Sequence, residues 1–266
     1  MTKKVTVNTI QKYKDEGKKF SVLTAYDYST AKYLDEAGID IILIGDSLAM
    51  VALGYETTHA VGVEEMAIFT RAVAKGVQHA MVITDMPFLS YHTDIVAAVK
   101  NCGEMIRLGA NAVKIEGYSE YILSVVRRLT ESGIPVVSHI GFTPQFVNTL
   151  GGYKIQGKTK EAAEILLKQA KELVDAGAFS ILLEMVPQDC AKLISENISV
   201  PTISCGAGKY CDGQVLVSDD VFGKYSEFKP KFARKYADMK SLILECAKKF
   251  DEDVKNGSFP SDSEVF

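Results

Sequence analysis

The stretch SVLTAYDYSTAKYLDEAGIDIILIGDSLAM, residues 21–50, carries the pattern that decides the fold of this chain. Two short apolar runs, SVLTAYD (21–27) and DIILIGD (40–46), flank a more polar segment that ends at Gly38. Each run is too short for a buried helix and does not alternate between apolar and polar residues, which is typical of strands buried on both faces of a parallel sheet. A glycine just before a strand commonly ends the preceding helix. The stretch therefore predicts a strand, a helix and a second strand.

The same pattern continues along the chain. Six further runs of this kind follow: AMVITD (80–85), AVKIEG (112–117), PVVSHIG (135–141), SILLEMV (180–186), PTISCGAG (201–208) and QVLVSDD (214–220). Segments of helical period separate most of them, as in 159–177, where Thr159 is the expected N-cap. The glycines expected to end such helices are Gly38, Gly76, Gly109, Gly133 and Gly177. Eight strands that alternate with helices predict an α/β fold, a (βα)8 TIM barrel, with a doubly wound open sheet as the alternative.

The composition limits the class of protein. Of the 266 residues, 47% are hydrophobic, and the net charge is −4. We therefore expect one barrel domain over 1–266, with a short N-terminal extension and a polar, frayed tail at 251–266. The charge argues against nucleic acid as a partner, and the lack of an apolar run of about 18 residues argues against a membrane. The polar N-terminus is unlike a signal peptide and the five cysteines form no CxxC pair, so we expect a cytoplasmic protein with reduced thiols.

Polar side chains end most of the predicted strands. The strand ends carry Asp27, Asp46 with Ser47, Asp85, Lys114 with Glu116, Ser138 with His139, and Glu184. In a parallel barrel these ends meet at one rim, where active sites are built. Carboxylates gathered there repel one another unless shifted pKa values or a cation compensate, and oxygen ligands suit Mg²⁺. The alternatives are helix capping for a single aspartate and a structural ion pair for Lys114 and Glu116.

The spacing of these residues suggests individual roles. Lys114 and Glu116 lie two residues apart, so both should point from one face of their strand into the barrel mouth. Glu184 ends an apolar run and is the candidate general base, with a buried structural carboxyl as the alternative. For His139 a ligand, a proton shuttle and a hydrogen-bonded rim histidine are all open, and we favour the last. The glycine- and lysine-rich segment 151–160 is the expected active-site loop.

Several motifs, taken in their order along the chain, resemble those of the ketopantoate hydroxymethyltransferase family. They are TAYDYS (24–29), GDS (45–47), DMPF (85–88), KIEG (114–117), GGYKIQG (151–157) and LLEMVP (182–187), and the resemblance runs from about residue 8 to 240. It implies a barrel of the phosphoenolpyruvate/pyruvate superfamily that binds Mg²⁺. It also implies transfer of a hydroxymethyl group from 5,10-methylenetetrahydrofolate to 3-methyl-2-oxobutanoate, which forms 2-dehydropantoate (ketopantoate) in pantothenate and coenzyme A biosynthesis through an enolate and an aldol-type addition.

The resemblance also assigns roles residue by residue. Asp46 and Asp85 would bind both the metal and the substrate, and Glu116 would face the metal as a third ligand. Ser47 and Lys114 would bind the substrate, a small 2-oxo acid. Glu184 would be the proton acceptor. The family further implies a homo-oligomer, a decamer of two stacked pentamers, with the 2-oxo acid and folate as small-molecule partners.

This chain differs from the usual family pattern at a few positions. Residues 57–62 read TTHAVG and lack a proline and a threonine that the family usually has there, while Ser138 and Cys205 also replace the usual residues. None of these positions carries a predicted metal or base role. Three alternatives stay open: an isocitrate-lyase-like C–C lyase, a phosphonopyruvate mutase, and a catalytically silent sensor of metal or oxo acid. A silent sensor would be expected to lose the base, yet Glu184 is present.

Overall fold

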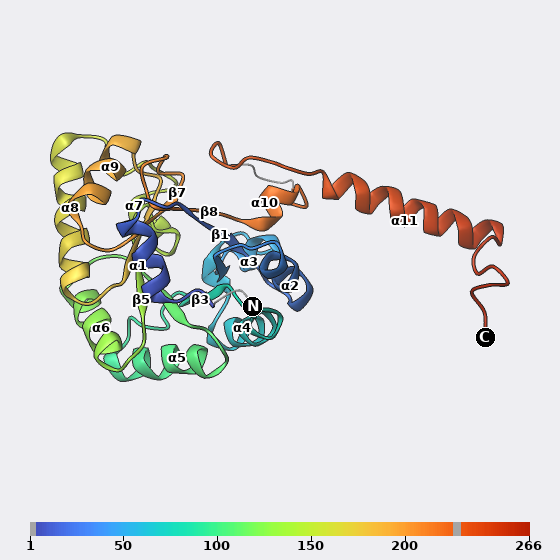
Figure 1. Cartoon of the computed structure of the whole chain (residues 1–266), viewed down its shortest axis with the longest axis horizontal. Coiled ribbons are helices and arrows are strands. Elements are labelled where there is room, and N and C mark those ends of the chain that lie inside the picture. Colours follow the sequence, from blue (N-terminus) through green and yellow to red (C-terminus); the bar gives the residue numbers. More distant parts are fainter. Residues whose placement is uncertain (1–3, 226–229) are drawn as a thin grey trace. The chain divides into compact units, whose positions relative to one another are not determined.

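A computed structural model describes residues 4–225 and 230–266 of the chain. Its strands are β1 (Phe20–Thr24), β2 (Ile41–Ile44), β3 (Met81–Asp85), β4 (Ala112–Glu116), β5 (Val136–Gly141), β6 (Ser180–Glu184), β7 (Thr202–Cys205) and β8 (Gly213–Leu216). They pair in parallel in chain order, and β8 pairs with β1, so the sheet closes (Figure 1). The predicted barrel is confirmed, and the alternative of an open sheet is wrong.

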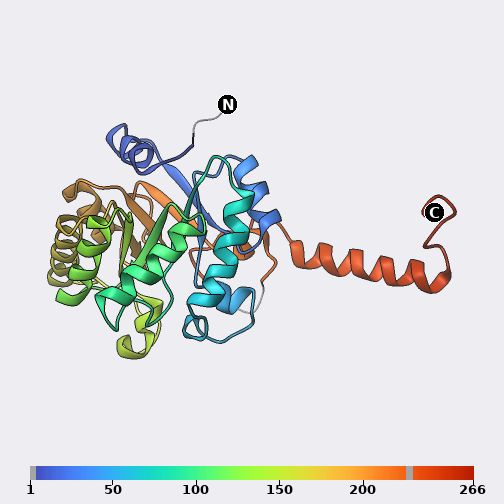
Figure 2. The ribbon, with the colours of Figure 1, turned by 90° about the horizontal axis from the view of Figure 1, so that it is seen from below.

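Helices and short 3-10 turns alternate with these strands (Figures 1 and 2). They are α1 (Val7–Asp15), α2 (Tyr28–Glu36), α3 (Leu48–Val51), η1 (Thr58–Ala60), α4 (Val63–Gly76), α5 (Ile95–Arg107), α6 (Glu120–Glu131), η2 (Pro144–Phe146), α7 (Val147–Leu150), α8 (Lys160–Asp175) and α9 (Gln188–Asn197), followed by α10 (Ser218–Phe222) and α11 (Met239–Asn256). The predicted cap of α8 is confirmed, because Thr159 Oγ1 accepts the amide hydrogen of Ala162 at 3.2 Å.

One end of the barrel is filled by apolar side chains. Inward-facing residues of all eight strands form a single core with Ile10 of α1, which is fully buried. Four of these core residues are Ile83, Ala112, Val137 and Leu182. Side chains two residues apart point to the same face of a strand. The residue two positions after each of these four core residues therefore also points into the barrel, at its mouth. Those residues are Asp85, Lys114, His139 and Glu184.

Four of the five expected helix-ending glycines adopt the left-handed backbone that this role requires. Gly38, Gly109, Gly133 and Gly177 have φ between +80° and +113°. The prediction for Gly76 is wrong, because this residue is the last residue of α4 itself. A Cβ atom there would lie 2.5 Å from the carbonyl oxygen of Tyr28, so the glycine instead permits α4 to lie close to α2.

The chain divides into two compact units after Leu216. The first contains the whole barrel, and the second contains α10 and α11. The expected frayed tail is wrong for 251–256, because α11 continues to Asn256, where Gly257 ends it with φ +76°. The expectation of a single domain over 1–266 stays a prediction. No helix in the described part of the chain has the length and apolar character needed to cross a membrane.

Candidate active site

Five side chains predicted at the strand ends meet in a buried cluster at the barrel mouth. Asp46, Asp85, Lys114, Glu116 and His139 are each less than a tenth exposed. Lys114 Nζ lies 3.1 Å from Asp85 Oδ2 and 3.2 Å from Glu116 Oε1. The amide of Asp46 donates a hydrogen bond of 3.1 Å to Asp85 Oδ2. The prediction that Lys114 and Glu116 point together into the barrel mouth is confirmed.

His139 connects this cluster to the predicted base. Its Nδ1 lies 3.3 Å from Glu116 Oε1, and its Nε2 lies 3.3 Å from Glu184 Oε2. The second contact has the distance of an ion pair but not the geometry of a hydrogen bond. The Glu184 side chain is 16% exposed, so it borders the open part of the barrel mouth. The favoured interpretation of His139 as a hydrogen-bonded rim residue agrees with this position, and its other roles stay open.

Burial and neighbouring charges shift the pKa values of the cluster in opposite directions. Burial raises the pKa of the Asp46 carboxyl to about 8, and the negative charges of Glu116 and Asp85 add to that effect. Burial alone would raise the pKa of Glu116 as well, but Lys114 and His139 outweigh it and lower the pKa to about 2. At neutral pH, Glu116 is therefore ionised, whereas Asp46 favours ionisation only when another positive charge lies beside it.

The same balance keeps the two basic groups charged. Burial lowers the pKa of His139, as does Lys114, but its contacts with the carboxylates of Glu116 and Glu184 raise the pKa to about 9 overall. Burial also opposes charge on Lys114, yet Asp85, Glu116 and Asp46 hold its pKa well above the usual value. Both side chains are therefore positively charged at neutral pH.

The donor set fits a divalent cation. The three carboxylates of the cluster, together with Glu184, face two basic side chains, which leaves a surplus of two negative charges when all six groups are ionised. Asp85 Oδ1 is buried without a hydrogen-bond partner, and a cation would satisfy it. Mg²⁺ takes one or two carboxylates and keeps several waters, so Asp46 and Asp85 suffice.

Glu116, the third predicted metal ligand, already contacts other groups of the protein through both of its carboxylate oxygens. Glu116 Oε1 contacts Lys114 and His139, and Glu116 Oε2 accepts the amide hydrogen of Gln145 at 3.1 Å. Over residues 4–225 and 230–266, no three or more His, Cys, Asp or Glu side chains are arranged so that together they could bind a metal ion. The role of Glu116 as a direct ligand stays a prediction.

Ser47 lies beside the cluster, as expected for a substrate-binding residue. Its hydroxyl lies 2.9 Å from the hydroxyl of Tyr26. A Cβ atom at Gly45 would lie 2.7 Å from Ser47 Oγ, so a larger residue there would displace the serine hydroxyl. The remaining strand-end aspartate, Asp27, has a structural role, because its carboxylate caps α2 by accepting the amide hydrogen of Thr30 at 2.9 Å.

The glycine- and lysine-rich segment lies beside the predicted base. The amide of Gln156 donates a 3.0 Å hydrogen bond to the carbonyl of Met185, which directly follows Glu184. Within the same segment, the ring of Tyr153 packs against Phe142 with a centroid distance of 4.9 Å. The segment therefore borders the barrel mouth, as the prediction of an active-site loop requires.

Two buried residues of the site were not predicted. Gln145 in η2 donates through Nε2 to Asp46 Oδ2 at 2.9 Å, and its Oε1 accepts a 2.8 Å hydrogen bond from the hydroxyl of Tyr91. Both residues are nearly or fully buried. They follow β5 and β3 by several residues rather than ending them, so a search of strand ends for charged residues passes over them. A glutamine six residues after the predicted rim histidine His139 is the sequence signal that could have pointed to Gln145.

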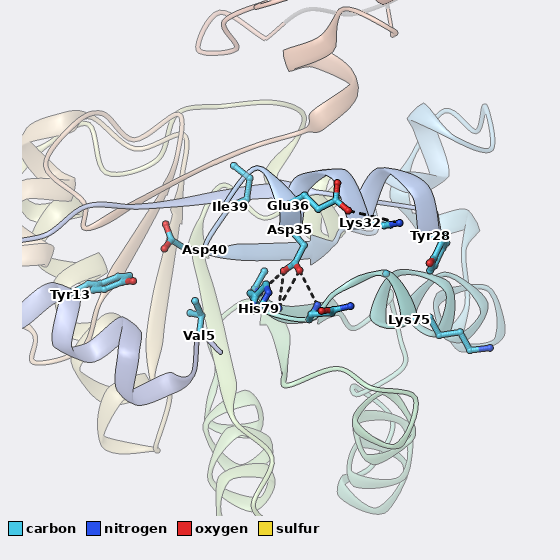
Figure 3. A pocket seen from close by; sticks show the side chains of 14 residues that line it. Val5, Tyr13, Tyr28, Lys32, Asp35, Glu36, Ile39, Asp40, Lys75 and His79 are labelled. Carbon is cyan, nitrogen blue, oxygen red and sulfur yellow. Dashed lines mark hydrogen bonds and ion pairs between the residues drawn. The ribbon is translucent and has the colours of Figure 1, made fainter. Parts of the chain in front are cut away.

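A separate cavity of about 630 Å³ lies at the opposite end of the barrel (Figure 3). It is lined by residues that precede β2 and β3, among them Asp40 and His79. Its buried carboxylate, Asp35, accepts hydrogen bonds of 2.6–3.2 Å from the amides of Gln78, His79 and Ala80. These bonds fix the entry into β3, which is a structural role.

Comparison with known proteins assigns the chain to a family. The sequence profile described as ketopantoate hydroxymethyltransferase matches residues 4–262. The chain belongs to the ketopantoate hydroxymethyltransferase family. A relative from Clostridium botulinum (strain Alaska E43 / Type E3), named 3-methyl-2-oxobutanoate hydroxymethyltransferase, is 50% identical over 99% of this chain and 96% of its own length. One of the same name from Thermotoga neapolitana is 50% identical over 98% and 96%. The expected assignment to this transferase family is confirmed.

Solved structures of other proteins share the barrel fold of this ketopantoate hydroxymethyltransferase family member. A crystal structure of phosphonopyruvate hydrolase in complex with oxalate and Mg++ has a TM-score of 0.63 at 14% identity and covers 99% of this chain and 93% of that one. A crystal structure of 2,3-dimethylmalate lyase, described as a member of the PEP mutase/isocitrate lyase superfamily, has a TM-score of 0.61 at 14% identity, covering 98% and 91%. The expected superfamily fold is confirmed, and at this identity the likeness concerns the fold alone.

Proposed function

We propose that this chain transfers a hydroxymethyl group from 5,10-methylenetetrahydrofolate to 3-methyl-2-oxobutanoate and so forms 2-dehydropantoate. The observation that carries the proposal is the junction at His139, which joins the partly exposed carboxylate Glu184 to the buried cluster of Asp46, Asp85 and Lys114. A proton acceptor at the edge of a site for an anionic oxo acid is what the reaction needs. The names of relatives that are 50% identical support the same substrate.

Asp46 and Asp85 would hold a Mg²⁺ ion, with Glu116 facing it. When bound, the ion would supply positive charge to the ketone and carboxylate oxygens of the oxo acid and so make its C3 proton more acidic. The orphaned Asp85 Oδ1 and the negative surplus of the cluster support this proposal.

Three side chains of the protein would have separate roles in the reaction. Lys114, held between Asp85 and Glu116, provides a fixed positive charge where negative charge develops on the substrate. Ser47, two residues after Gly45, binds the substrate carboxylate. Glu184 accepts the proton from C3, and the freed electron pair forms the bond to the methylene carbon of the folate. Water supplies the hydroxyl oxygen, and the carbon–nitrogen bonds to the folate break to release tetrahydrofolate.

The cellular setting forms part of the same proposal. We expect a homo-oligomer, a decamer as in the family pattern, which acts in the cytoplasm within pantothenate biosynthesis. The five cysteines are free thiols, which suits a reducing compartment.

The test is an assay of purified protein with 3-methyl-2-oxobutanoate, methylenetetrahydrofolate and Mg²⁺, with detection of 2-dehydropantoate by mass spectrometry. We expect product that disappears in excess chelator and returns when Mg²⁺ is restored. Asp46→Asn and Asp85→Asn should both weaken Mg²⁺ binding. Full activity in chelator would exclude the role of the cation.

The same protein can be tested against the open alternatives. In deuterated water without folate, a transferase of this mechanism should exchange the C3 proton of the oxo acid for deuterium. A silent sensor would bind the oxo acid without exchange. Cleavage of 2,3-dimethylmalate or turnover of phosphonopyruvate, with no 2-dehydropantoate formed, would favour a lyase or a mutase.

A further inference from the structure

Gln145 occupies a central position among the loops that follow the barrel strands. It lies in η2, after β5, and only 3% of it is exposed. Its side-chain nitrogen donates 2.9 Å hydrogen bonds to Asp46 Oδ2 and to the carbonyl of Met86. Its main-chain amide donates to Glu116 Oε2 at 3.1 Å. One residue therefore bonds to the loops after β2 and β3 and to the end of β4.

The hydrogen bonds also fix which way the Gln145 amide group points. Both groups beside Nε2 are acceptors, whereas the group beside Oε1 is the donating hydroxyl of Tyr91, at 2.8 Å. A rotation of the amide by 180° would place an acceptor against two acceptors. Tyr91 is fully buried and is itself held, because its hydroxyl accepts the amide hydrogen of Glu116 at 3.2 Å. The Gln145 side chain thus has a single orientation.

The fixed orientation of the Gln145 amide restricts the Asp46 carboxylate. Because one of its carboxylate oxygens is bonded to the fixed Nε2, rotation of the carboxylate is restricted. The donor is neutral, so it orients the carboxylate without adding a charge that would compete with a cation. Lys114, in contrast, binds Asp85 and Glu116 through a full positive charge. The Gln145 side chain can therefore orient the Asp46 carboxylate while leaving its charge for a metal ion.

We infer that Gln145 is a positioning residue, which holds the Asp46 carboxylate in the orientation that receives the cation. This inference rests on the proposed function, because it assumes that Asp46 is a ligand. In this role the Gln145 side chain acts through the Asp46 carboxylate, to which it donates, rather than as a ligand of the ion. Loss of an outer-shell hydrogen bond of this kind typically weakens metal affinity by 10–100-fold.

The experiment measures binding of Mn²⁺, a paramagnetic substitute for Mg²⁺, to the full chain by electron paramagnetic resonance without substrate. Gln145→Met keeps the volume of the side chain and removes its hydrogen bonds. We expect its Mn²⁺ affinity to fall roughly 10–100-fold and the spectrum of bound Mn²⁺ to broaden, with circular dichroism unchanged. Gln11→Met, the same substitution on α1 at the other end of the barrel, should leave both unchanged.

Gln145→Asn keeps the amide but is one methylene shorter, so it cannot reach Asp46 and Met86 together. It serves as a second variant if Gln145→Met does not fold, and we expect weaker Mn²⁺ binding from it too. Wild-type affinity and an unchanged spectrum in a folded Gln145 variant would overturn the inference while leaving the proposed function intact. A wild-type protein that binds no Mn²⁺ would overturn the proposed function and this inference with it.

Discussion

At the scale of single residues, the barrel mouth buries ionisable side chains whose charged forms are more stable in water. Burial disfavours the charged form of every group in the cluster, and the structure offsets this by contact between opposite charges. The positive neighbours outweigh burial at Glu116 and lower its pKa to about 2, whereas the pKa of Asp46 is raised to about 8. Two carboxylates of one cluster therefore behave in opposite ways because Lys114 and His139 both contact Glu116. Such a division is typical of a functional site.

The role of Glu184 is a prediction at this scale. Glu184→Gln keeps the volume and removes the basic oxygen, so we expect a folded protein that still binds Mg²⁺ and the oxo acid. Its exchange of the C3 proton with solvent and its overall turnover should both fall by roughly 10²–10⁴, the usual contribution of a positioned general base. Exchange is measured by nuclear magnetic resonance and turnover by product formation. Glu164→Gln, on the exposed face of α8, is the matched control.

Different outcomes for Glu184→Gln would locate its role differently. Normal exchange with lost turnover would move the role to the folate step. Normal behaviour in both assays would mean that another group is the base, and His139, which contacts both Glu184 and Glu116, is the first alternative only if substrate or cation binding makes it neutral.

The strand ends could be predicted from the sequence because a strand has a fixed period. Ala112 lies in the core, so Lys114 and Glu116 must share its direction. Gln145 could not be found in this way, because it lies in a 3-10 turn whose side-chain directions depend on the path of the loop. Gly76 shows the same limit. A glycine near the end of a predicted helix can either end that helix or let a neighbouring helix pack closely against it, and both cases look the same in the sequence. Only the packing of α4 on α2 shows that Gly76 has the second role.

At the scale of elements, the segment 57–62 contains no proline, and side-chain contacts hold it. His59 Nε2 donates a 2.9 Å hydrogen bond to the carbonyl of Gln145, so this tautomer carries its hydrogen on Nε2. The imidazole also packs on Phe88, with ring centroids 4.4 Å apart. In this chain a side-chain contact to η2 therefore supports η1, where a proline ring would otherwise restrict the backbone.

This contact predicts the behaviour of a His59 variant. His59→Phe keeps a ring against Phe88 and loses the hydrogen bond, so the amides of 57–62 should exchange with solvent roughly 2–10-fold faster. Hydrogen exchange followed by mass spectrometry measures this effect. His79→Phe, which lines the cavity at the opposite end of the barrel, should leave this segment unchanged. Unaltered exchange in His59→Phe would show that the bond does not support the segment.

The short helix α10 gives a pH-dependent prediction. Burial and the adjacent Asp219 raise the pKa of Asp220 to about 6 from 3.8. The folded state therefore binds the proton more tightly than the unfolded state, and stability falls as pH rises from about 4 to about 6. Asp220→Asn removes that loss, so its melting temperature should exceed that of the wild type at pH 8, and the difference should shrink toward pH 4.5.

Thermal melts between pH 4.5 and 8 measure the effect of Asp220→Asn. Asp262→Asn, in the exposed C-terminal segment, is the control and should melt like the wild type throughout. A difference between Asp220→Asn and the wild type that stays constant over this pH range would contradict the assigned cause.

At the scale of the whole molecule, the helix α11 contributes no side chain to a buried core. None of the 18 residues of α11, all of which the structure describes, is buried. Met239, Ile243, Phe250 and Val254 recur at helical spacing along one side and are 39–57% exposed. An exposed apolar stripe of this length is typical of a surface that another chain covers. This observation supports the proposed association of the chain with copies of itself.

Association is therefore the last prediction. Light scattering at micromolar concentration should give a particle of many subunits, ten chains of 29.1 kDa each for the expected decamer. The double variant Ile243→Asp with Val254→Asp adds two negative charges to the stripe and should give a smaller particle, because charged residues at the centre of an interface are costly to desolvate. Lys248→Glu changes the charge by the same amount on the opposite face of α11 and should keep the wild-type size. A wild-type particle of 29.1 kDa would exclude the oligomer, and a double variant of wild-type size would exclude α11 as its contact surface.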